Sequence, residues 1–366
     1  MIVRRLRVRD FRTYESADVA LGAGLTVVHG RNGAGKTNRL EALYFGCTGR
    51  SCRTNDERRI VRFGQPAARV EVEVEGRDGD HALSVGFQPG EPKRIRVDGV
   101  AVEALGEHPS RPLVSVFLPD RLELIKGPPS LRRAHLDQVV TALWPARAAT
   151  RRGYSQALAQ RNALLGRVRA GHAGRDALAT WDAELARHGI ALRDDRATAV
   201  EAVAPAVTTI ALELGLAGDV ELRYRPRSKA PDADTLAAEL AERREADLER
   251  GFTTHGPHRD DLALIRDGRD LRIYGSQGEQ RLGLLALLLA ERSVLEAERG
   301  APPLMLLDDV MSELDADRRG RLVQRLRDGG QAVVTTTDLA HVPDADLPGV
   351  ERIAVSDGAV LQEVGA

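Results

Sequence analysis

The first 28 residues alternate between apolar and polar side chains, with the period expected of half-buried strands. The apolar positions are Ile2, Leu6, Val8, Phe11, Val19, Leu21, Leu25 and Val27. Because every second side chain of a strand points to the same face, this pattern predicts strands that bury one face. Residues 11–14, Phe-Arg-Thr-Tyr, are the predicted turn between the first two strands.

Two β-hairpins are predicted further along the chain. Residues 69–75 and 82–87 alternate strictly, and the glycines at positions 76 and 79 mark the turn between them. Residues 93–97 and 99–102 repeat the pattern over a shorter length. We therefore expect an antiparallel β-subdomain in this part of the chain.

Four other runs are apolar almost throughout, as in strands that are buried on both faces. They are residues 25–29 (LTVVH), 114–119 (VSVFLP), 304–307 (LMLL) and 331–337 (QAVVTTT). Continuous apolar strands are typical of parallel sheets covered by helices on both sides. The pattern thus favours an α/β fold.

Between residues 131 and about 216 the pattern becomes helical, rich in Ala, Leu, Arg and Glu. The apolar stripe comprises Trp181, Leu185, His188, Leu192, Ala199, Val203, Ala206, Ile210 and Leu214. Pro145, Gly171 and Gly174 interrupt it, so we expect several helices packed as a short antiparallel arm. Ser130 is the predicted cap of the first helix, and residues 231–249 predict one further amphipathic helix.

Composition narrows the class of protein without deciding it. The chain has 366 residues, which is enough for two domains. Its formal net charge is −1, so any nucleic-acid contact must come from a local basic patch. Its two cysteines, Cys47 and Cys52, make neither a zinc site nor a disulfide framework. With no apolar stretch of 18 residues and no signal-like start, we expect a cytoplasmic protein without a membrane segment.

The strongest motif follows the apolar run at residues 25–29. Residues 30–38 read GRNGAGKTN, which matches the phosphate-loop pattern G-x-x-x-x-G-K-[ST] ahead of a helix. The glycines let backbone N–H groups converge on phosphate oxygens, Lys36 supplies a positive charge, and the Thr37 hydroxyl is placed for Mg²⁺. The predicted nucleotide-binding residues are Gly30, Arg31, Asn32, Gly33, Ala34, Gly35, Lys36, Thr37 and Asn38.

Two acidic residues follow the apolar run at residues 304–307. Asp308 and Asp309 stand at the carboxyl end of a predicted buried strand, where parallel sheets place ligands and beside which a phosphate loop lies. Asp308 is the predicted Mg²⁺ partner of Thr37, and Asp309 the predicted base that polarises the attacking water.

A second anion-binding candidate lies just before a strongly apolar helix. Ser276 and Glu279 form an S-x-x-E capping box, which by itself indicates only a well-capped helix. Alternatively, the helix N-terminus around Ser276, Gln277, Gly278 and Glu279 presents N–H groups and a hydroxyl to a phosphate.

Basic residues gather in places where the pattern predicts loops. Residues 48–62 mix arginines with hydroxyl residues, which suits either a surface over phosphates or a solvated charge run. Arg12, in the turn ahead of the phosphate-loop strand, either stacks on or pairs with a nucleotide or is an exposed turn residue without a specific role. A polar loop at residues 251–262 contains His255, His258, Asp260 and Asp261; its residue types allow a metal site, whereas Arg259 favours a turn or a loop beside the nucleotide.

Taken together, the motifs resemble those of ATP-binding-cassette ATPases, and most closely those of the RecF family of bacterial recombination-repair proteins, relatives of SMC-type ATPases. The matching stretches are residues 11–14, 30–41, 48–54, 117–133, 256–262, 275–281 and 306–315. The resemblance implies an ABC-type P-loop ATPase head with an antiparallel β-subdomain and an inserted α-helical arm. Its expected parts are residues 1–130 and 251–366 for the head and 131–250 for the insertion.

The resemblance also implies a mechanism. Each ATP would lie between Lys36 of one subunit and Ser276 and Gly278 of another, with Asp315 crossing the interface of an ATP-dependent homodimer. The protein would bind DNA at junctions of duplex and single strand, act with RecR and RecO to load the recombinase, and associate with the nucleoid. Arg50, Arg53, Arg58, Arg132 and Arg133 are the candidate DNA contacts.

Two departures from the broad cassette pattern imply slow, DNA-stimulated ATP hydrolysis. Asp309 replaces the usual Glu, and Thr337 stands where most cassettes carry His. Two other classes remain open. One is a DNA-binding scaffold that uses ATP only to hold a dimer together, and the other is a transporter ATPase subunit, which would not need the helical insertion.

Overall fold

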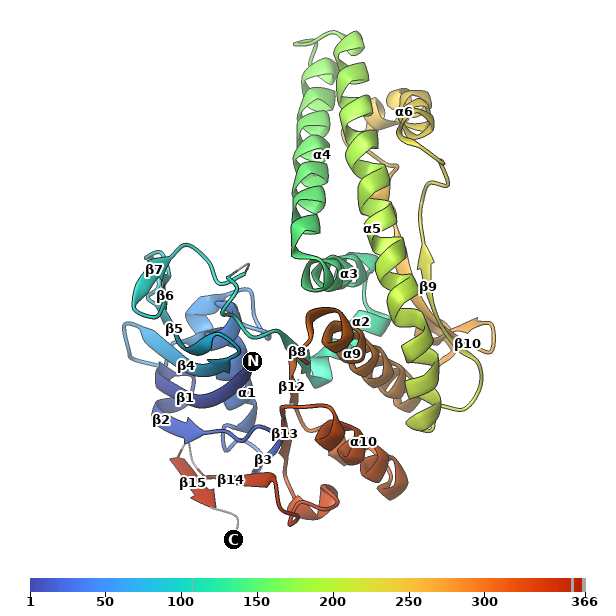
Figure 1. Cartoon of the computed structure of the whole chain (residues 1–366). Helices are drawn as coiled ribbons and strands as arrows, with labels where there is room; N and C mark the ends of the chain where they lie inside the picture. The colour runs from blue at the N-terminus through green and yellow to red at the C-terminus, as the bar shows by residue number, and fades with distance from the viewer. Residues whose placement is uncertain (107, 357–358, 364–366) are drawn as a thin grey trace. The chain divides into compact units, whose positions relative to one another are not determined.

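The computed structural model describes residues 1–106, 108–356 and 359–363, and the chain divides into two compact units (Figure 1). The first unit holds Met1–Arg121, Glu213–Gly215 and the described residues from Arg292 onward. The second holds Leu122–Leu212 and Leu216–Glu291. The fold is of the mixed α/β class that the sequence predicts.

An antiparallel sheet in the first unit contains both predicted hairpins. Its strands, in spatial order, are β2 (Tyr14–Ala20), β1 (Ile2–Phe11), β4 (Ala68–Gly76), β5 (Gly79–Phe87), β6 (Arg94–Val97) and β7 (Val100–Val102). The register pairs Phe11 with Tyr14 and Gly76 with Gly79, so both turns lie where the sequence places them. Because β1 is a central strand, this subdomain begins at the N-terminus.

The second sheet of this unit is parallel except at one edge. Its order is β15 (Ala359–Glu363), β14 (Val350–Ser356), β3 (Leu25–His29), β13 (Ala332–Thr336), β12 (Leu304–Leu307) and β8 (Val114–Phe117). All four predicted apolar strands lie here side by side, as expected for strands buried on both faces. The hairpin β14–β15 was not predicted.

Helix α1 (Lys36–Thr48) joins the two sheets by packing closely on β4. A Cβ atom at Gly46 would lie 2.4 Å from Val72 Cγ2, so only glycine permits this approach. Phe11 and Phe45 meet with ring centroids 5.7 Å apart in the same core. The unit also contains the 3₁₀ helices η1 (Glu57–Ile60), η6 (Val310–Glu313) and η7 (Leu339–His341), and the helix α10 (Ala316–Asp328).

The second unit is mainly helical. Its helices are α2 (Glu123–Lys126), α3 (Pro129–Leu143), α4 (Ala148–Arg169), α5 (Leu178–Glu213), α6 (Ala233–Glu242), α7 (Arg244–Arg250), α8 (Leu271–Tyr274) and the first part of α9 (Gln277–Arg299). A small antiparallel sheet has the order β11 (Arg269–Asp270), β10 (Asp261–Arg266), β9 (Val220–Arg225). Helices α4 and α5 run side by side as the predicted arm (Figure 1), with Arg161 Nε 2.7 Å from Asp182 Oδ1.

Two local predictions in this unit are wrong. Ser130 does not cap α3; Pro128 occupies the cap position and Pro129 the first turn, where a missing N–H costs nothing. The helix predicted over residues 231–249 is broken at Arg243 into α6 and α7. The break brings Arg244 within 2.6 Å of the Asp182 carboxylate.

Residues 251–291 lie in the second, mainly helical unit, whereas the proposed head comprises residues 1–130 and 251–366. Ion pairs explain the grouping. Arg132 binds both carboxylate oxygens of Asp261, and Arg196 contacts Asp260 at 3.4 Å, so strand β10 and the loop before it are tied to α3 and α5. Among the described helices, none is both long and apolar enough to cross a bilayer.

Candidate nucleotide site

The phosphate loop connects β3 to α1 with a backbone that depends on glycine. Gly30 has φ +154°, and a Cβ there would lie 2.2 Å from the Val355 carbonyl oxygen. Gly35 has φ +107°, and its Cβ would meet the Tyr14 hydroxyl at 3.0 Å. The Tyr14 hydroxyl instead donates a hydrogen bond to the Gly35 carbonyl oxygen. Side chains at these two positions would collide with neighbouring atoms, so glycine is needed for the loop to bring its backbone N–H groups together.

Lys36 folds back over this loop. Its ammonium donates hydrogen bonds to the carbonyl oxygens of Gly30 at 2.6 Å and Arg31 at 3.0 Å, and the residue is 7% exposed. Burial lowers the pKa of Lys36, while Asp309 and Asp308 act in the opposite direction. A cation held by two neutral carbonyls is placed to exchange them for a ligand anion.

Thr37 and Asp308 meet across the parallel sheet. The Thr37 hydroxyl lies 2.8 Å from Asp308 Oδ2 and 3.0 Å from Oδ1, although the residues are 271 positions apart in the chain. Asp308 is 6% exposed at the end of β12. Thr335, at the end of β13, donates a hydrogen bond to the same carboxylate at 2.7 Å. A threonine hydroxyl and a carboxylate thus converge on one point beside the loop.

Asp309 occupies an unusual backbone position next to this cluster. Its φ is +48°, in the left-handed region that residues other than glycine, Asn and Asp rarely adopt. Its N–H donates to Thr335 Oγ1 at 3.0 Å, and its own carbonyl accepts from Ser312 at 2.9 Å. Within the described residues, the buried Oδ1 atom of Asp309 has no hydrogen-bond partner. Burial raises the pKa of Asp309, and the Asp308 charge adds to the effect.

A second buried carboxylate supports the loop from behind. Glu41 of α1 is fully buried and binds Arg12 through two hydrogen bonds, of 2.7 and 2.9 Å. It also accepts from Ser51 at 2.6 Å and Arg53 at 3.3 Å. Arg53 in turn donates to Asn38 at 3.0 Å. The basic loop after α1 is therefore pinned to the helix that carries Lys36 and Thr37.

Sequence reasoning missed two of these residues, Glu41 and Thr335. Glu41 stands in a helix among buried apolar neighbours, a position at which a charged residue requires a partner. Thr335 belongs to the polar end of the run QAVVTTT, where the apolar pattern of the strand stops. Both signals are visible in the sequence but do not specify a partner.

The capping box in the second unit forms as predicted. The Ser276 N–H donates to Glu279 Oε2 at 2.8 Å, and the Glu279 N–H donates to Ser276 Oγ at 3.3 Å. Arg266 pairs with the same glutamate. Ser276, Gln277 and Gly278 are all exposed. The local role is therefore a helix cap that leaves its N-terminus open to solvent.

Asp315 also has a local role, as the cap of α10. Its carboxylate accepts a hydrogen bond from the Arg318 N–H at 2.9 Å, and its side chain is 57% exposed. The carboxylate therefore both starts the helix and faces solvent, so a contact from another molecule can reach it.

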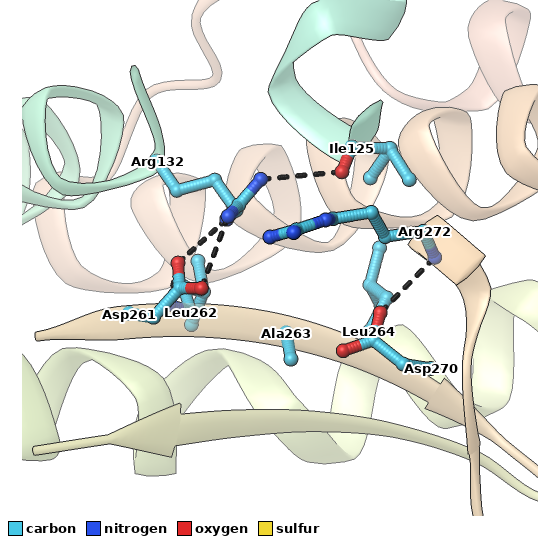
Figure 2. Close-up of a pocket in the computed structure, with 8 residues that line it drawn as sticks. All are labelled: Ile125, Arg132, Asp261, Leu262, Ala263, Leu264, Asp270 and Arg272. Atoms are coloured by element: carbon cyan, nitrogen blue, oxygen red, sulfur yellow. Dashed lines mark hydrogen bonds and ion pairs between the residues drawn. The ribbon is translucent and has the colours of Figure 1, made fainter. Parts of the chain in front are cut away.

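The five candidate DNA contacts lie in different environments. Arg50 and Arg58 are exposed, whereas the Arg53 guanidinium donates hydrogen bonds to Glu41 and Asn38. Arg132 is 4% exposed and binds Asp261 and the Ile125 carbonyl oxygen (Figure 2). It also donates to the Gly127 carbonyl oxygen, so its donors are committed within the fold. Arg133 is half-buried and donates to the Asp260 carbonyl oxygen at 2.8 Å.

The polar loop at residues 251–262 is structural. His258 accepts from the Tyr154 hydroxyl through Nδ1 at 2.7 Å and donates to the Thr253 carbonyl through Nε2 at 2.9 Å. Burial lowers the pKa of His258 to about 4. No group of His, Cys, Asp and Glu that could hold a metal ion occurs among the described residues.

Comparison with known proteins places this chain in a family. Residues 5–107 match a family described as an AAA domain. The DNA replication and repair protein RecF of Symbiobacterium thermophilum is 36% identical over 96% of both chains. RecF of Myxococcus xanthus is 39% identical over 99% of this chain and 97% of its own. The chain belongs to the RecF family.

Solved structures agree with this assignment. RecF described with ATP in the RecFOR pathway has a TM-score of 0.88 and 28% identity, and covers 99% of this chain and 98% of that one. The complex described as RecF-ATPrS has a TM-score of 0.86 at the same identity and coverage. An SMC head bound to the C-terminal winged-helix domain of ScpA, 17% identical with a TM-score of 0.62, shares the fold with the RecF family over 99% of this chain.

Proposed function

We propose that this RecF-family protein binds ATP with Mg²⁺ at residues 30–38, dimerises on ATP and binds DNA during replication and repair. The observation that carries the proposal is the meeting of Thr37 and Asp308 beside the glycine-dependent loop, with Lys36 folded over that loop. Relatives along nearly the whole chain are named for DNA replication and repair, and solved RecF structures are described with ATP.

The residues present fit a magnesium ion. Mg²⁺ prefers oxygen ligands and keeps several waters, so one hydroxyl and one carboxylate are a sufficient protein contribution. Thr37 and Asp308 supply these oxygens, and Thr335 orients the carboxylate. When bound, the ion would neutralise charge on the phosphates.

The remaining residues have distinct roles in this proposal. Lys36 exchanges the carbonyls of Gly30 and Arg31 for phosphate oxygens, and the loop N–H groups bind the phosphates. Asp309 accepts a hydrogen bond from the attacking water through its unpartnered Oδ1 and holds it in line. The Asp309 side chain is one methylene shorter than the usual Glu and so reaches less far towards the water, which supports slow hydrolysis; stimulation by DNA is part of the same proposal.

The exposed N-terminus of α9 supports a composite site in a homodimer. Ser276, Gln277 and Gly278 present a hydroxyl and N–H groups to solvent within one capped turn, and such a turn favours an anion. In the proposed dimer these groups contact the nucleotide held by Lys36 of the other subunit, and the exposed Asp315 crosses the interface. Cooperation with RecR and RecO and association with the nucleoid are part of the same proposal.

DNA contacts are assigned to exposed arginines. Arg50 and Arg58 are accessible, and Arg53 can reach phosphate only by releasing Asn38 or Glu41. Arg133 is a weaker candidate. Arg132 is no longer a candidate, because its guanidinium has a structural role. Contacts to phosphate alone give little base specificity and a strong dependence of affinity on salt.

The test is the fluorescence anisotropy of a labelled gapped duplex, with and without ATP and Mg²⁺, for wild type and Asp309→Asn. Binding that requires ATP and lasts longer in Asp309→Asn supports a clamp that hydrolysis releases. Equal lifetimes in the two proteins would favour a scaffold that uses ATP only to dimerise. Absence of binding under every condition would refute the proposal.

A further inference from the structure

The side chain of Phe63, in the first unit, is fully exposed, at 101% of its reference area. It stands at the tip of a tight turn closed by a hydrogen bond from the Gln65 N–H to the Arg62 carbonyl oxygen, 3.0 Å long. Gly64, the next residue, has φ +81°, which such a turn needs at its third position. The turn thus holds an aromatic ring out in solvent.

The segment that leads into the turn is anchored, so the exposure of Phe63 does not result from a loose loop. Ile60 is fully buried, and Val61 packs against the same core cluster. The Arg62 N–H donates to the Asp10 carbonyl oxygen at 2.8 Å, and the Arg62 guanidinium pairs with the Asp10 carboxylate at 2.9 Å. The Phe63 ring lies in solvent although Ile60 and Val61 pack into the core. The folded state therefore lacks the stabilisation that burial of this ring would give.

The surroundings of the ring are basic. Residues 50–62 carry five arginines and two acidic residues, and Arg58 and Arg59 precede Phe63 by a few positions and are exposed. The acidic groups have partners: Glu57 binds Lys93 at 2.6 Å, and Asp56 lies 3.5 Å from Arg59. Two further acids near the turn, Asp10 at 2.9 Å and Glu15 at 3.6 Å, both pair with Arg62. An exposed aromatic ring flanked by arginines suits an unstacked base with its phosphates.

The same segment is connected to the nucleotide loop by hydrogen bonds. The Arg12 N–H donates to the Ile60 carbonyl oxygen at 2.7 Å. The Arg12 guanidinium binds Glu41, which also holds Arg53 beside Asn38. Hydrogen bonds through Arg53, Glu41 and Arg12 therefore link Asn38 to the segment before the turn within the first unit.

We infer that Phe63 stacks on an unpaired base of DNA, with Arg58 and Arg59 on the flanking phosphates. This inference rests on the proposed DNA-binding function and adds to it a contact that recognises single-stranded or frayed DNA. A lipid surface would require a broader apolar area. Among the described residues of this unit, the other exposed large apolar side chains are Val100 and Leu347, and both lie outside the basic segment.

The experiment compares wild type with Phe63→Ala, Phe63→Tyr, Arg59→Ala and Leu347→Ala in the full-length protein with ATP and Mg²⁺. Leu347, 41% exposed and directly after Asp346 in the chain, is the control for loss of an exposed apolar side chain. The DNA probes are a gapped duplex and a duplex of the same length closed by hairpins at both ends. Anisotropy is measured over a series of salt concentrations.

We expect Phe63→Ala to weaken binding of the gapped duplex about tenfold, in line with the loss of one stacked base, and to leave the closed duplex unaffected. Phe63→Tyr keeps the stacking face and the affinity. The slope of log affinity against log salt is unchanged in Phe63→Ala but falls by about 1 in Arg59→Ala, since only the arginine contacts a phosphate.

Equal affinity of wild type and Phe63→Ala for the gapped duplex would overturn the inference while leaving the proposed function intact. An equal loss on both duplexes would overturn it too, because it would indicate a contact that does not depend on an unpaired base. If the wild type binds neither probe, the proposed function itself fails. Thermal stabilisation of each variant by ATP, which does not involve DNA, verifies that the nucleotide site is folded.

Discussion

Thr335 joins the two acidic residues at the end of β12: its hydroxyl donates to the Asp308 carboxylate at 2.7 Å and accepts from the Asp309 N–H at 3.0 Å. One hydroxyl on a neighbouring strand thereby fixes the direction of the carboxylate and the backbone of the next residue. Because Asp309 has a positive φ, its position depends on such support.

Thr335→Val should therefore slow ATP hydrolysis more than it weakens ATP binding. The variant keeps the shape of the side chain but removes a hydrogen bond to a charged group, and a change of about 1.4 kcal/mol corresponds to tenfold in rate. We expect kcat to fall about tenfold. Steady-state phosphate release and equilibrium binding of a fluorescent ATP analogue measure the two quantities separately.

Thr26→Val is the matched control for this prediction. Thr26 lies in β3 of the same sheet, is fully buried, and its hydroxyl oxygen has no hydrogen-bond partner within the described part of the chain. Its replacement removes an equivalent hydroxyl without a functional contact, so the rate should stay at the wild-type level. A similar loss of rate in both variants would contradict the role of Thr335.

Asp309→Asn should raise the thermal midpoint of the protein without nucleotide while reducing hydrolysis. Burial raises the pKa of Asp309, which means that the fold disfavours its charged form, and a neutral isostere removes that cost. Such a trade of stability against activity is common at catalytic positions. Differential scanning fluorimetry at neutral pH tests it; a lower midpoint in Asp309→Asn would count against it.

The same raised pKa predicts how hydrolysis responds to acid. The base is active when ionised, so the rate should begin to fall at a pH above that expected for an ordinary aspartate. The profile of kcat/KM against pH reports this ionisation in the protein without bound nucleotide. A rate that stays constant down to the range of exposed aspartates would exclude Asp309 as the titrating group.

Much of the site could be predicted from the sequence because its parts are local patterns. The phosphate loop, the strand that ends in Asp308 and the capping box of Ser276 each lie within about ten consecutive residues, so spacing alone identifies them. The apolar strands of the parallel sheet were identified in the same way, since burial on both faces leaves a continuous apolar run.

Contacts between distant positions could not be predicted in this way. Nothing in the spacing of Arg132 indicates that Asp261 takes its guanidinium, and a charged run gives no sign that Glu41 holds Arg53. The assignment of residues 251–291 to the helical unit has the same origin, because it rests on ion pairs between segments far apart in the sequence. β14 was missed because its burial alternates only weakly.

Glu41→Ala should destabilise the first unit strongly. It would leave Arg12, 18% exposed, and Arg53 without their buried counter-ion, and breaking a buried pair on one side costs about 3 kcal/mol or more. We expect a decrease of the thermal midpoint by roughly 6–10 °C. Glu15→Ala is the control: Glu15 is 80% exposed and 3.6 Å from Arg62, so its midpoint should hardly change. Equal midpoints for the two variants would show that the Glu41 cluster contributes little.

His258 should make the stability of the second unit depend on pH. Its pKa is about 4 in the folded protein against 6.5 for an ordinary histidine, so the unfolded chain takes up a proton between these values and the folded chain does not. Stability is therefore full above pH 6.5 and decreases as the pH falls towards 4, with a slope of at most about 1.4 kcal/mol per pH unit.

His258→Gln removes this titration and should flatten the curve between pH 6.5 and 4. Thermal midpoints at half-unit steps of pH provide the measurement. The control is His172→Gln at an exposed position, which should follow the wild-type curve. If wild type and His258→Gln lose stability in parallel, another group causes the acid sensitivity.

Mixed dimers test the proposal that Ser276 acts on the nucleotide held by another subunit. Lys36→Ala removes the cation that folds over the loop, and Ser276→Arg fills the open N-terminus of α9 with a bulky charge. Each variant alone should lack ATP hydrolysis because every composite site carries a defect. An equimolar mixture should recover about a quarter of the wild-type rate, since half of the dimers are mixed and half of their sites are intact.

The control is Ser276→Asn, which retains a helix cap and tests whether loss of the cap alone accounts for the defect. Failure of the mixture to recover any activity, with both variants folded, would indicate that Lys36 and Ser276 do not act across a dimer interface.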